Sequence, residues 1–384
     1  CRQIHFGSQC ATESVFRYQY RNNDVYSRWC GLLGKGINSV NSRKDIPFLP
    51  ISFFRTHKVV SFKEEPIAFF KSSGTSSSTV SRHWIRTFDL YERSFLSNFE
   101  QFFGKTENYC FIALLPNYQQ QGNSSLVYMM QGLISRSKYS ESGFYPHKVE
   151  KIRDILLHNE SLNIPTILFG VSYALLDLAE AYNFKLQHTT VFETGGMKGR
   201  RKELPKQELH KILCQSLGVQ SIASEYGMCE LFSQAYSKAD GSFYCPNQMR
   251  VDIKEVNDPF SDCSIGKAGV INITDLANID TCSFIATEDI GKKHKDGSFE
   301  ISGRLDNAAV DITGADSTSG IASIGYQKVK ADESYDVNGT WVTWDAANKL
   351  SLTESGKYVI YARITDNAGN VSAEYAKSFA ESEF

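Results

Sequence analysis

The feature that most constrains this chain is the alternation of short apolar runs with helical patterns between residues 110 and 217. Apolar runs bounded by turn signals predict buried strands, and apolar residues that recur every three or four positions predict helices. Strands that alternate with helices imply a mostly parallel sheet with helices on both faces, the organisation of an α/β domain. The strands are expected at 110–115, 166–169 and 189–192, and the helices at 124–135, 148–158, 172–182 and 206–217.

The residues before this region carry weaker signals. Asp89 looks like an N-cap, and the helix it would open has aromatic residues at helical spacing that we interpret as core: Phe95, Phe99 and Phe102. Residues 1–48 show little periodicity apart from a helix near 26–33. Residues 47–54 are interpreted as an extended aromatic segment leading to the first core strand.

The residues after Gly241 change to shorter β segments, and the pattern changes again near Asp306. From about Val310 the chain is rich in Thr, Ser, Asp and Gly, which predicts a small β-sandwich without a disulfide, since no cysteine follows Cys282. We therefore expect two domains, 1–307 and 310–384. The β segments are expected at 249–253, 269–273 and 298–301 with a hairpin turn at 295–297, and then at 341–344 and 358–364.

Composition narrows the class of protein. The chain has 384 residues, of which 41% are hydrophobic and 22% charged, as in an ordinary globular protein. Its formal net charge of -2 argues against nucleic acid or an anionic membrane as a partner. None of the 9 cysteines forms a C-x-x-C pair, which favours reduced thiols and a cytoplasmic location. No apolar run reaches membrane-spanning length, and no secretory signal precedes the first domain, although the first residue is Cys1 rather than Met.

The run 72–78, Ser-Ser-Gly-Thr-Ser-Ser-Ser, follows a short apolar segment that ends at Phe70. Such a loop can turn successive backbone N–H groups and hydroxyls inward, which makes a cradle for an anion such as a phosphate chain. A flexible linker has the same composition, so the run alone leaves both interpretations open.

Four further segments place chemically useful residues in order along the chain. Gly195 and Gly196 follow a predicted strand and precede a basic cluster, and glycines there permit close approach of a ligand. The segment 224–230 combines Tyr226, Gly227 and Glu230, which offer an aromatic face and a carboxylate suited to Mg²⁺. An acidic turn at 287–291 and the segment 303–306 complete the series. Ligands of parallel sheets bind at the carboxyl ends of the strands, where the first two segments fall.

Taken together, this order resembles the adenylate-forming ligases, and within them the acyl-protein synthetases of the bacterial luciferase fatty-acid reductase system (LuxE-like proteins). The likeness covers roughly residues 45–307. It rests on Ser72-Ser73-Gly74-Thr75, 115–118, 122–126, Glu193-Thr194-Gly195-Gly196, 225–230, 274–278 and 303–307.

The resemblance implies activation of a carboxylic acid by ATP and Mg²⁺, giving an acyl-adenylate and pyrophosphate. It assigns the phosphates to the loop, the adenine site to Tyr226, Mg²⁺ to Glu230 and the ribose hydroxyls to Asp289. Arg304 would contact the ribose or a phosphate, and residues 118–130 with Gly195-Gly196 would flank the acyl slot. The implied catalytic residues are Thr75, Glu230 and Arg304; the implied nucleotide-binding residues are Ser72, Ser73, Gly74, Thr75, Ser76, Gly195, Gly196, Tyr226, Gly227, Asp289 and Arg304.

Three departures from the family pattern bear on the reaction. Ser76-Ser77 stands where the family has Thr-Gly, and Cys229 replaces a common Thr; we interpret Cys229 as a small buried residue rather than a nucleophile. The family's acyl-carrying cysteine, shortly after G-R-x-D, is absent here, which argues against acyl transfer to a thiol of this chain. The superfamily's small C-terminal domain with its lysine is not visible either.

The segment after 310 resembles bacterial immunoglobulin-like surface repeats at 319–321, 339–341 and 365–370. We interpret 365–370 as a strand-connecting turn rather than a Ca²⁺ loop. Surface repeats and ATP-dependent ligases belong to different compartments, so we hypothesise that the junction near Asn307 is an unnatural or mis-assembled fusion.

Two other functions stay open: a non-catalytic acyl or nucleotide binder, and a surface binding protein acting through the β module. The substrate is expected to be a fatty or an aryl carboxylic acid, with an acyl-reductase or acyl-carrier protein as a partner.

Overall fold

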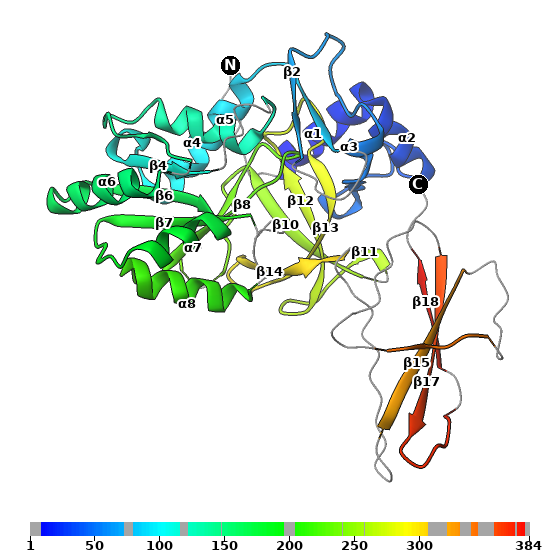
Figure 1. The fold of residues 1–384 in the computed structure, drawn as a ribbon. Helices are drawn as coiled ribbons and strands as arrows, with labels where there is room; N and C mark the ends of the chain where they lie inside the picture. The colour runs from blue at the N-terminus through cyan, green and yellow to red at the C-terminus, as the bar shows by residue number, and fades with distance from the viewer. Residues whose placement is uncertain are drawn as a thin grey trace. The chain divides into compact units, whose positions relative to one another are not determined.

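The computed structural model describes residues 9–72, 80–115, 122–146, 148–195, 204–239, 241–256, 258–305, 321–330, 339–344, 357–372 and 375–380. The chain divides into two compact units, Cys1–Ser302 and Gly303–Phe384, whose elements are labelled in Figure 1. The predicted domain boundary at 307–310 falls shortly after this division, and the assignment of domains stays a prediction.

One of the two large sheets in the described part of the first unit is mostly parallel, as predicted. It has six strands in the order β5-β4-β6-β7-β8-β9, all parallel to their neighbours except β9, which is antiparallel to β8. Its parallel strands are almost completely buried because helices cover both faces, which explains their continuous apolar runs. The strands are β4 Cys110–Leu114, β5 Gly143–Phe144, β6 Thr166–Val171, β7 Thr189–Thr194, β8 Ile222–Tyr226 and β9 Ala235–Ser237.

Helices pack on both faces of this sheet, with α4 and α5 on one face and α7 and α8 on the other (Figure 1). The predicted helices are confirmed within a few residues at each end. Asp89 is not an N-cap, however, because Phe88 occupies that position and Asp89 lies in the first turn, where its charge favours the helix dipole. The helices are α4 Asp89–Phe103, α5 Ser125–Ile134, α6 Val149–Ser161, α7 Ser172–Ala181 and α8 Lys206–Leu217.

The other sheet of the first unit is mostly antiparallel, with the order β1-β13-β12-β10-β11 and β14 paired to β13. The short β segments predicted after Gly241 all belong to it. Its strands are β1 Leu49–Pro50, β10 Met249–Glu255, β11 Asp258–Asp262, β12 Ala268–Asp275, β13 Phe284–Lys293 and β14 Phe299–Arg304.

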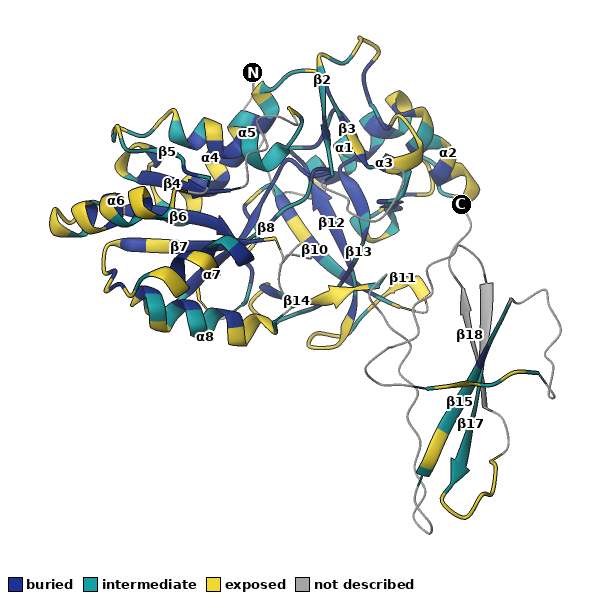
Figure 2. Ribbon diagram, in the orientation of Figure 1, coloured by how far each residue is buried: buried dark blue, intermediate teal, exposed yellow. Residues whose placement is uncertain are grey.

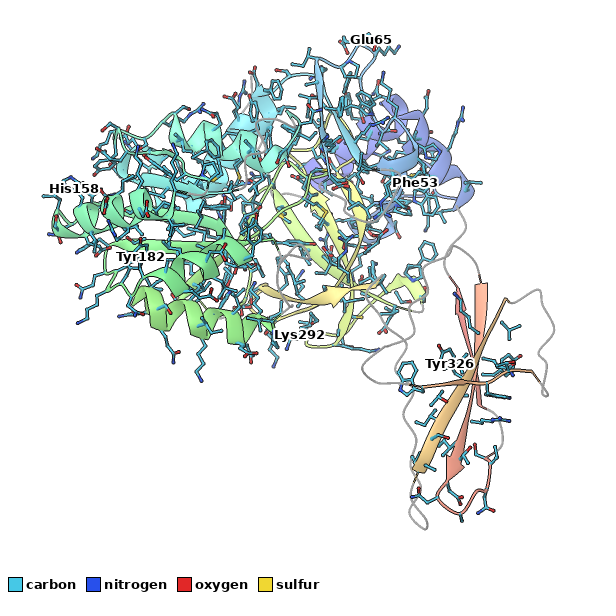
Figure 3. The ribbon with its side chains drawn as sticks, in the orientation of Figure 1. Phe53, Glu65, His158, Tyr182, Lys292 and Tyr326 are labelled. Carbon is cyan, nitrogen blue, oxygen red and sulfur yellow. The ribbon has the colours of Figure 1, made fainter. Side chains whose placement is uncertain are left out.

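Three helices that precede the parallel sheet pack on the core of the antiparallel sheet. The low periodicity of residues 1–48 hid α1, and only α2 corresponds to a predicted helix. Phe53, labelled in Figure 3, starts α3 rather than continuing an extended segment, and its ring lies 5.6 Å from that of Trp29. These helices are α1 Gln9–Asn22, α2 Asp24–Leu32 and α3 Phe53–Thr56; two 3-10 turns, Arg43–Asp45 and Thr106–Asn108, complete the helical segments.

Each of the two large sheets of the first unit has its own hydrophobic core. Figure 2 shows the strands of the parallel sheet largely buried and the outer faces of the covering helices exposed. The predicted core aromatics Phe95 and Phe99 are buried in the parallel-sheet core, and Phe102 packs against it half-buried. Every helix in the described part of the chain is too short or too polar to cross a membrane.

The second unit contains an antiparallel sheet in the order β16-β15-β17-β18. A sandwich needs two sheets, and the described residues of this unit provide one, so the β character is as predicted while the sandwich stays a prediction. Asp366 accepts hydrogen bonds from the N–H groups of Ala368 and Asn370, which is the geometry of a tight turn. The strands are β15 Ile321–Lys330, β16 Val342–Thr343, β17 Lys357–Asp366 and β18 Tyr375–Ala380.

Candidate active site

The predicted phosphate loop connects the two strands of an antiparallel hairpin, β2 Ala68–Lys71 and β3 Arg82–Ile85. Ser72 continues the pairing: its N–H donates to Ser81 O at 3.2 Å, and its hydroxyl accepts from Ser81 N at 3.1 Å. The N–H of Lys71 donates to Asn123 O at 2.8 Å, which places this hairpin beside the start of α5. Of the predicted phosphate-binding residues, only Ser72 is described; Ser73, Gly74, Thr75 and Ser76 lie outside the described residues, as does Tyr118.

Polar side chains gather at the carboxyl ends of β6, β7 and β8. The Ser172 hydroxyl bonds to the Glu193 carboxylate and lies 2.7 Å from Gly195 O. Thr194 donates to Glu225 Oε2 at 3.0 Å, joining β7 to β8. Because parallel strands end at the same edge, residues far apart in sequence meet here. We call Ser172, Glu193, Thr194, Glu225 and His210 the carboxyl-edge cluster.

Burial sets the electrostatics of this cluster. It raises the pKa of Glu225 from 4.5 to about 7; the hydrogen bond from Thr194 opposes this rise and the nearby Glu193 carboxylate adds to it. His210 Nε2 is buried 3.8 Å from Glu193 Oε2 and has no hydrogen-bond partner among the described residues. A Cβ at Gly227 would lie 2.3 Å from Glu225 Oε1, so glycine leaves room for this carboxyl group. Gly195 has a φ of 67°, which favours glycine, and Gly196 lies outside the described residues.

Tyr226 and Asp289, two predicted nucleotide-binding residues, meet in the structure. The Tyr226 hydroxyl donates to Asp289 Oδ2 at 2.6 Å, although the residues lie on strands of different sheets, β8 and β13. Both are buried, and the Tyr226 ring contacts Phe243 and Phe299 edge-on. A carboxylate has several acceptor directions, so Asp289 can bond to a ribose hydroxyl as well as to Tyr226. Two motifs are thus joined by a hydrogen bond between Tyr226 and Asp289, which lie 63 residues apart in the sequence.

Glu230, the predicted Mg²⁺ ligand, lies in the loop 227–233 that follows β8, and it is buried. Asn278 Nδ2 donates to the backbone oxygen of Glu230 at 2.8 Å. Asp275 accepts from the N–H groups of Phe232 and Ser233 at 2.8 and 2.9 Å and from the Ser233 hydroxyl at 2.7 Å. The motif 274–278, which carried part of the resemblance, therefore fastens the loop that presents Glu230. We call Asp275, Asn278 and Thr281 the polar hub.

Cys229, beside Glu230, is buried as interpreted from the sequence. Burial raises the pKa of its thiol well above the ordinary value, and the neighbouring Glu230 carboxylate adds to this effect. A nucleophilic cysteine needs a lowered pKa and some exposure, so this site lacks the environment that activates a thiol.

The residues around Glu230 fit Mg²⁺ that arrives with a nucleotide. The described residues contain no group of three His, Cys, Asp or Glu side chains able to hold a metal by themselves. Mg²⁺ is commonly held by one or two carboxylates together with substrate phosphates and waters, so a single carboxylate fits this mode.

Arg304 is the last residue of β14 and is exposed. It belongs to the second compact unit, beyond the division at Ser302–Gly303. Its assignment to the ribose or a phosphate stays a prediction.

Three residues of this region were not predicted from the sequence: His83, Ser172 and His210. Ser172 and His210 approach Glu193 only in the folded protein, so the sequence carries no signal for them. His83 is buried in β3, a short strand whose alternating burial is seen only in the structure.

Comparison with known proteins identifies solved structures with a similar fold. No protein-family model matches the chain, and no curated protein matches it. Among solved structures, 2-hydroxyisobutyryl-CoA ligase in the postadenylation state, in complex with R3-HIB-AMP, superposes with a TM-score of 0.59 at 12% identity, over 78% of this chain and 67% of that one. An open conformation of the same ligase with 2-HIB-AMP and CoA gives a TM-score of 0.58 at 13% identity, over 79% and 75%. ATP-bound MatB from Rhodopseudomonas palustris gives 0.50 at 16% identity, over 71% and 56%.

These likenesses establish the fold class. The chain has a parallel sheet flanked by helices like the large domain of adenylate-forming ligases, followed by a mostly β region. It spans about two thirds of the first ligase structure and little more than half of MatB. The expected α/β fold is therefore confirmed.

Proposed function

We propose that this chain activates a carboxylic acid with ATP, forming an acyl-adenylate and releasing pyrophosphate. The observation that carries the proposal is the hydrogen bond from Tyr226, the residue immediately before the loop of Glu230, to Asp289 on β13. The solved structures of similar fold support it, because one holds an acyl-adenylate and another holds ATP.

In the proposed reaction a substrate carboxylate oxygen attacks the α-phosphorus of ATP, the bond to the bridging oxygen breaks, and pyrophosphate leaves. Asp289 would hold the ribose hydroxyls in a position fixed by Tyr226. Glu230 would bind Mg²⁺, which offsets the negative charge that develops as pyrophosphate leaves. The loop 72–78 would donate hydrogen bonds to the phosphates, and Arg304 to the ribose or a phosphate. The neutral form of Glu225 would limit repulsion of an approaching carboxylate.

The finer assignment is an acyl-protein synthetase of the LuxE-like kind acting on a fatty acid, with an aryl acid as the other substrate class. Transfer of the acyl group to a cysteine of this chain is not part of the proposal, because no cysteine follows Cys282. The acceptor would then belong to a partner such as an acyl-reductase or acyl-carrier protein. We propose the second unit as a separate immunoglobulin-like module, with the boundary near residue 307.

The test is acid-dependent ATP–pyrophosphate exchange, measured over a panel of fatty and aryl acids. Glu230→Ala and Asp289→Ala are each expected to lower the exchange rate by at least about a hundredfold, as loss of a group that contacts the reacting phosphates or fixes the nucleotide does. Glu288→Ala is the matched control for Asp289, since Glu288 is the preceding residue and pairs with Arg55 at 2.9 Å. It is expected to leave exchange within about threefold of wild type.

No exchange with any acid, in a protein with native secondary structure, would contradict the proposal and leave a non-catalytic binder. Exchange that survives both active-site substitutions would reject the assigned residues while retaining the reaction.

A further inference from the structure

His83 joins two segments that the proposed reaction needs in a fixed relation. It lies on β3, two residues after Ser81, which closes the hairpin of the predicted phosphate loop. Its ring Nδ1 lies 2.8 Å from the backbone oxygen of Cys229, the residue before Glu230. A single side chain thus connects the hairpin of one loop to the backbone of the other.

The ring is held on several sides. A carbonyl oxygen can only accept, so Nδ1 carries the proton and donates to Cys229 O. Nε2 faces the Thr281 hydroxyl of the polar hub at 3.3 Å. The ring also stacks on Phe232 with 4.6 Å between centroids and an interplanar angle of 5°. The side chain is fully buried, and a ring fixed in this way has little freedom to change its position.

The aromatic contacts extend this connection to the other strand of the hairpin. Phe232 lies 5.2 Å from the ring of Tyr91 on α4, and Tyr91 lies 5.1 Å from Phe70 on β2. The loop 227–233 therefore contacts β3 through His83 and is linked to β2 through Tyr91. Both strands that flank residues 73–79 are tied to the loop of Glu230.

We propose that His83 is a positioning residue that sets the Glu230 loop relative to the β2–β3 hairpin, and thereby the position from which Glu230 binds Mg²⁺. The inference rests on the proposed function. His83 itself would contact neither the nucleotide nor the metal. Its effect would pass through the Cys229 carbonyl, which is one peptide unit from Glu230.

Three substitutions separate the contacts of the ring. His83→Asn places an amide N–H near the position of Nδ1 and keeps the bond to Cys229 O. His83→Gln keeps size and polarity but moves the amide one bond further out, toward the position of Nε2. His83→Phe keeps the ring stacked on Phe232 and removes both polar contacts, which leaves the buried Cys229 carbonyl without this donor.

The measurement is the Mg²⁺ concentration that gives half-maximal ATP–pyrophosphate exchange, together with the KM of the acid. His83→Phe and His83→Gln are expected to raise the Mg²⁺ requirement about tenfold and to change the KM of the acid by less than about twofold, in keeping with loss of one buried hydrogen bond. His83→Asn is expected to stay within about threefold of wild type. If His83→Phe does not fold, the test is the Mg²⁺ requirement of His83→Gln compared with that of His83→Asn.

Gln19→Met is the matched control. Gln19 is also fully buried and donates to the backbone oxygens of Asn278 and Ile279, so it braces the same hub from α1 without touching the loop of Glu230. It is expected to lower thermal stability as His83→Phe does, with an unchanged Mg²⁺ requirement.

The outcomes separate this inference from the proposed function. A folded wild-type protein without exchange overturns both. Wild-type exchange with the same Mg²⁺ requirement in His83→Phe and His83→Gln overturns only the role of His83. An equal rise in the Mg²⁺ requirement in Gln19→Met would show a general loss of structure and would also overturn it.

Discussion

The carboxyl-edge cluster and the polar hub are both buried polar regions of the first unit. Burial raises the pKa of a carboxyl group in each, Glu225 and Asp275, but the two regions differ in their hydrogen bonding. In the hub, Asp275 accepts bonds from Phe232, Ser233 and Ala277, so its carboxylate is surrounded by donors. At the carboxyl edge, Glu225 accepts a hydrogen bond from Thr194, and His210 Nε2 has no hydrogen-bond partner among the described residues. A saturated network fixes backbone, whereas an unsaturated one leaves polar groups able to respond to a ligand or to pH. The hub is therefore built to fix backbone, whereas the edge keeps polar groups that can respond to a ligand or to pH.

The largest effect on the free energy of unfolding is expected from Asp275→Ala, which tests whether the hub supports the fold. The substitution leaves the buried N–H groups of Phe232 and Ser233 without their acceptor, so the free energy of unfolding should fall by about 4 kcal/mol. Urea denaturation measures it. Asp154→Ala is the control: Asp154 is exposed and pairs with its neighbour Arg153, so about 0.5 kcal/mol or less is expected. A loss below about 1 kcal/mol in Asp275→Ala would mean that the hub does not support the fold.

The second prediction concerns the pH dependence of the edge through Glu225. Its pKa is about 7 in the folded protein and close to 4.5 when unfolded, so the folded state holds a proton that the unfolded state has lost. This stability is fully present below pH 4.5 and is lost as pH rises to 7, by up to about 3 kcal/mol. Glu225→Gln should therefore gain stability relative to wild type between pH 5 and 8. Urea unfolding across this range measures the difference.

Glu208→Gln on the exposed surface of α8 is the control for Glu225 and should follow the wild-type curve. A wild-type minus Glu225→Gln difference that is flat with pH would show that Glu225 is ionised throughout. The carboxyl edge would then resemble the hub, and the contrast between the two regions would fail.

The third prediction concerns His83, whose pH dependence of stability is about as large as that of Glu225 but has the opposite sign. Burial lowers the pKa of His83 from 6.5 to about 4, while its hydrogen bonds to the backbone oxygens of Cys229 and Glu230 oppose the shift. Between these two pKa values the unfolded state binds a proton that the folded state does not bind. The free energy of unfolding therefore falls as pH drops from 6.5 toward 4, by up to about 3 kcal/mol. His83→Asn should remove this fall, because Asn does not titrate.

His158→Asn is the control, since His158 lies exposed on α6 and is labelled in Figure 3. Its unfolding curve should keep the wild-type loss of stability at low pH. Should His83→Asn keep that loss as well, the loss would belong to other groups and His83 would not be the neutral ring that the geometry describes. In that case the stabilities contributed by Glu225 and His83 would not have opposite pH dependences.

The sequence predicted the parallel sheet because its signal is local: each strand is an apolar run, and each helix has an apolar repeat. α8 was predicted at its observed bounds, Lys206–Leu217. α1 was missed because its buried face is partly polar; Gln19 is fully buried, and its partners are backbone oxygens more than 250 residues away. A helix whose burial depends on such distant partners gives a weak repeat.

The candidate site divides in the same way. Tyr226, Glu230 and Asp289 are assigned to the site from the order of motifs in the sequence, and this assignment stays a prediction. The bond from Tyr226 to Asp289 could not be predicted, since β8 and β13 belong to different sheets. Nor could His83, whose role depends on the carbonyl of Cys229, a backbone atom that any residue at that position would supply.

The smallest effect is expected at Cys229, which lies between the two regions. Cys229→Ala should change the free energy of unfolding by about 1 kcal/mol and leave ATP–pyrophosphate exchange within about twofold, because the thiol is buried and its raised pKa keeps it protonated. A thiol reagent at pH 8 should modify the exposed Cys10 at least about tenfold faster than Cys229 in the native protein. Cys30→Ala, which removes a buried thiol from the antiparallel-sheet core, is the matched control for stability. Exchange lost in Cys229→Ala but kept in Cys30→Ala would give the thiol a chemical role and contradict its interpretation as a small buried residue.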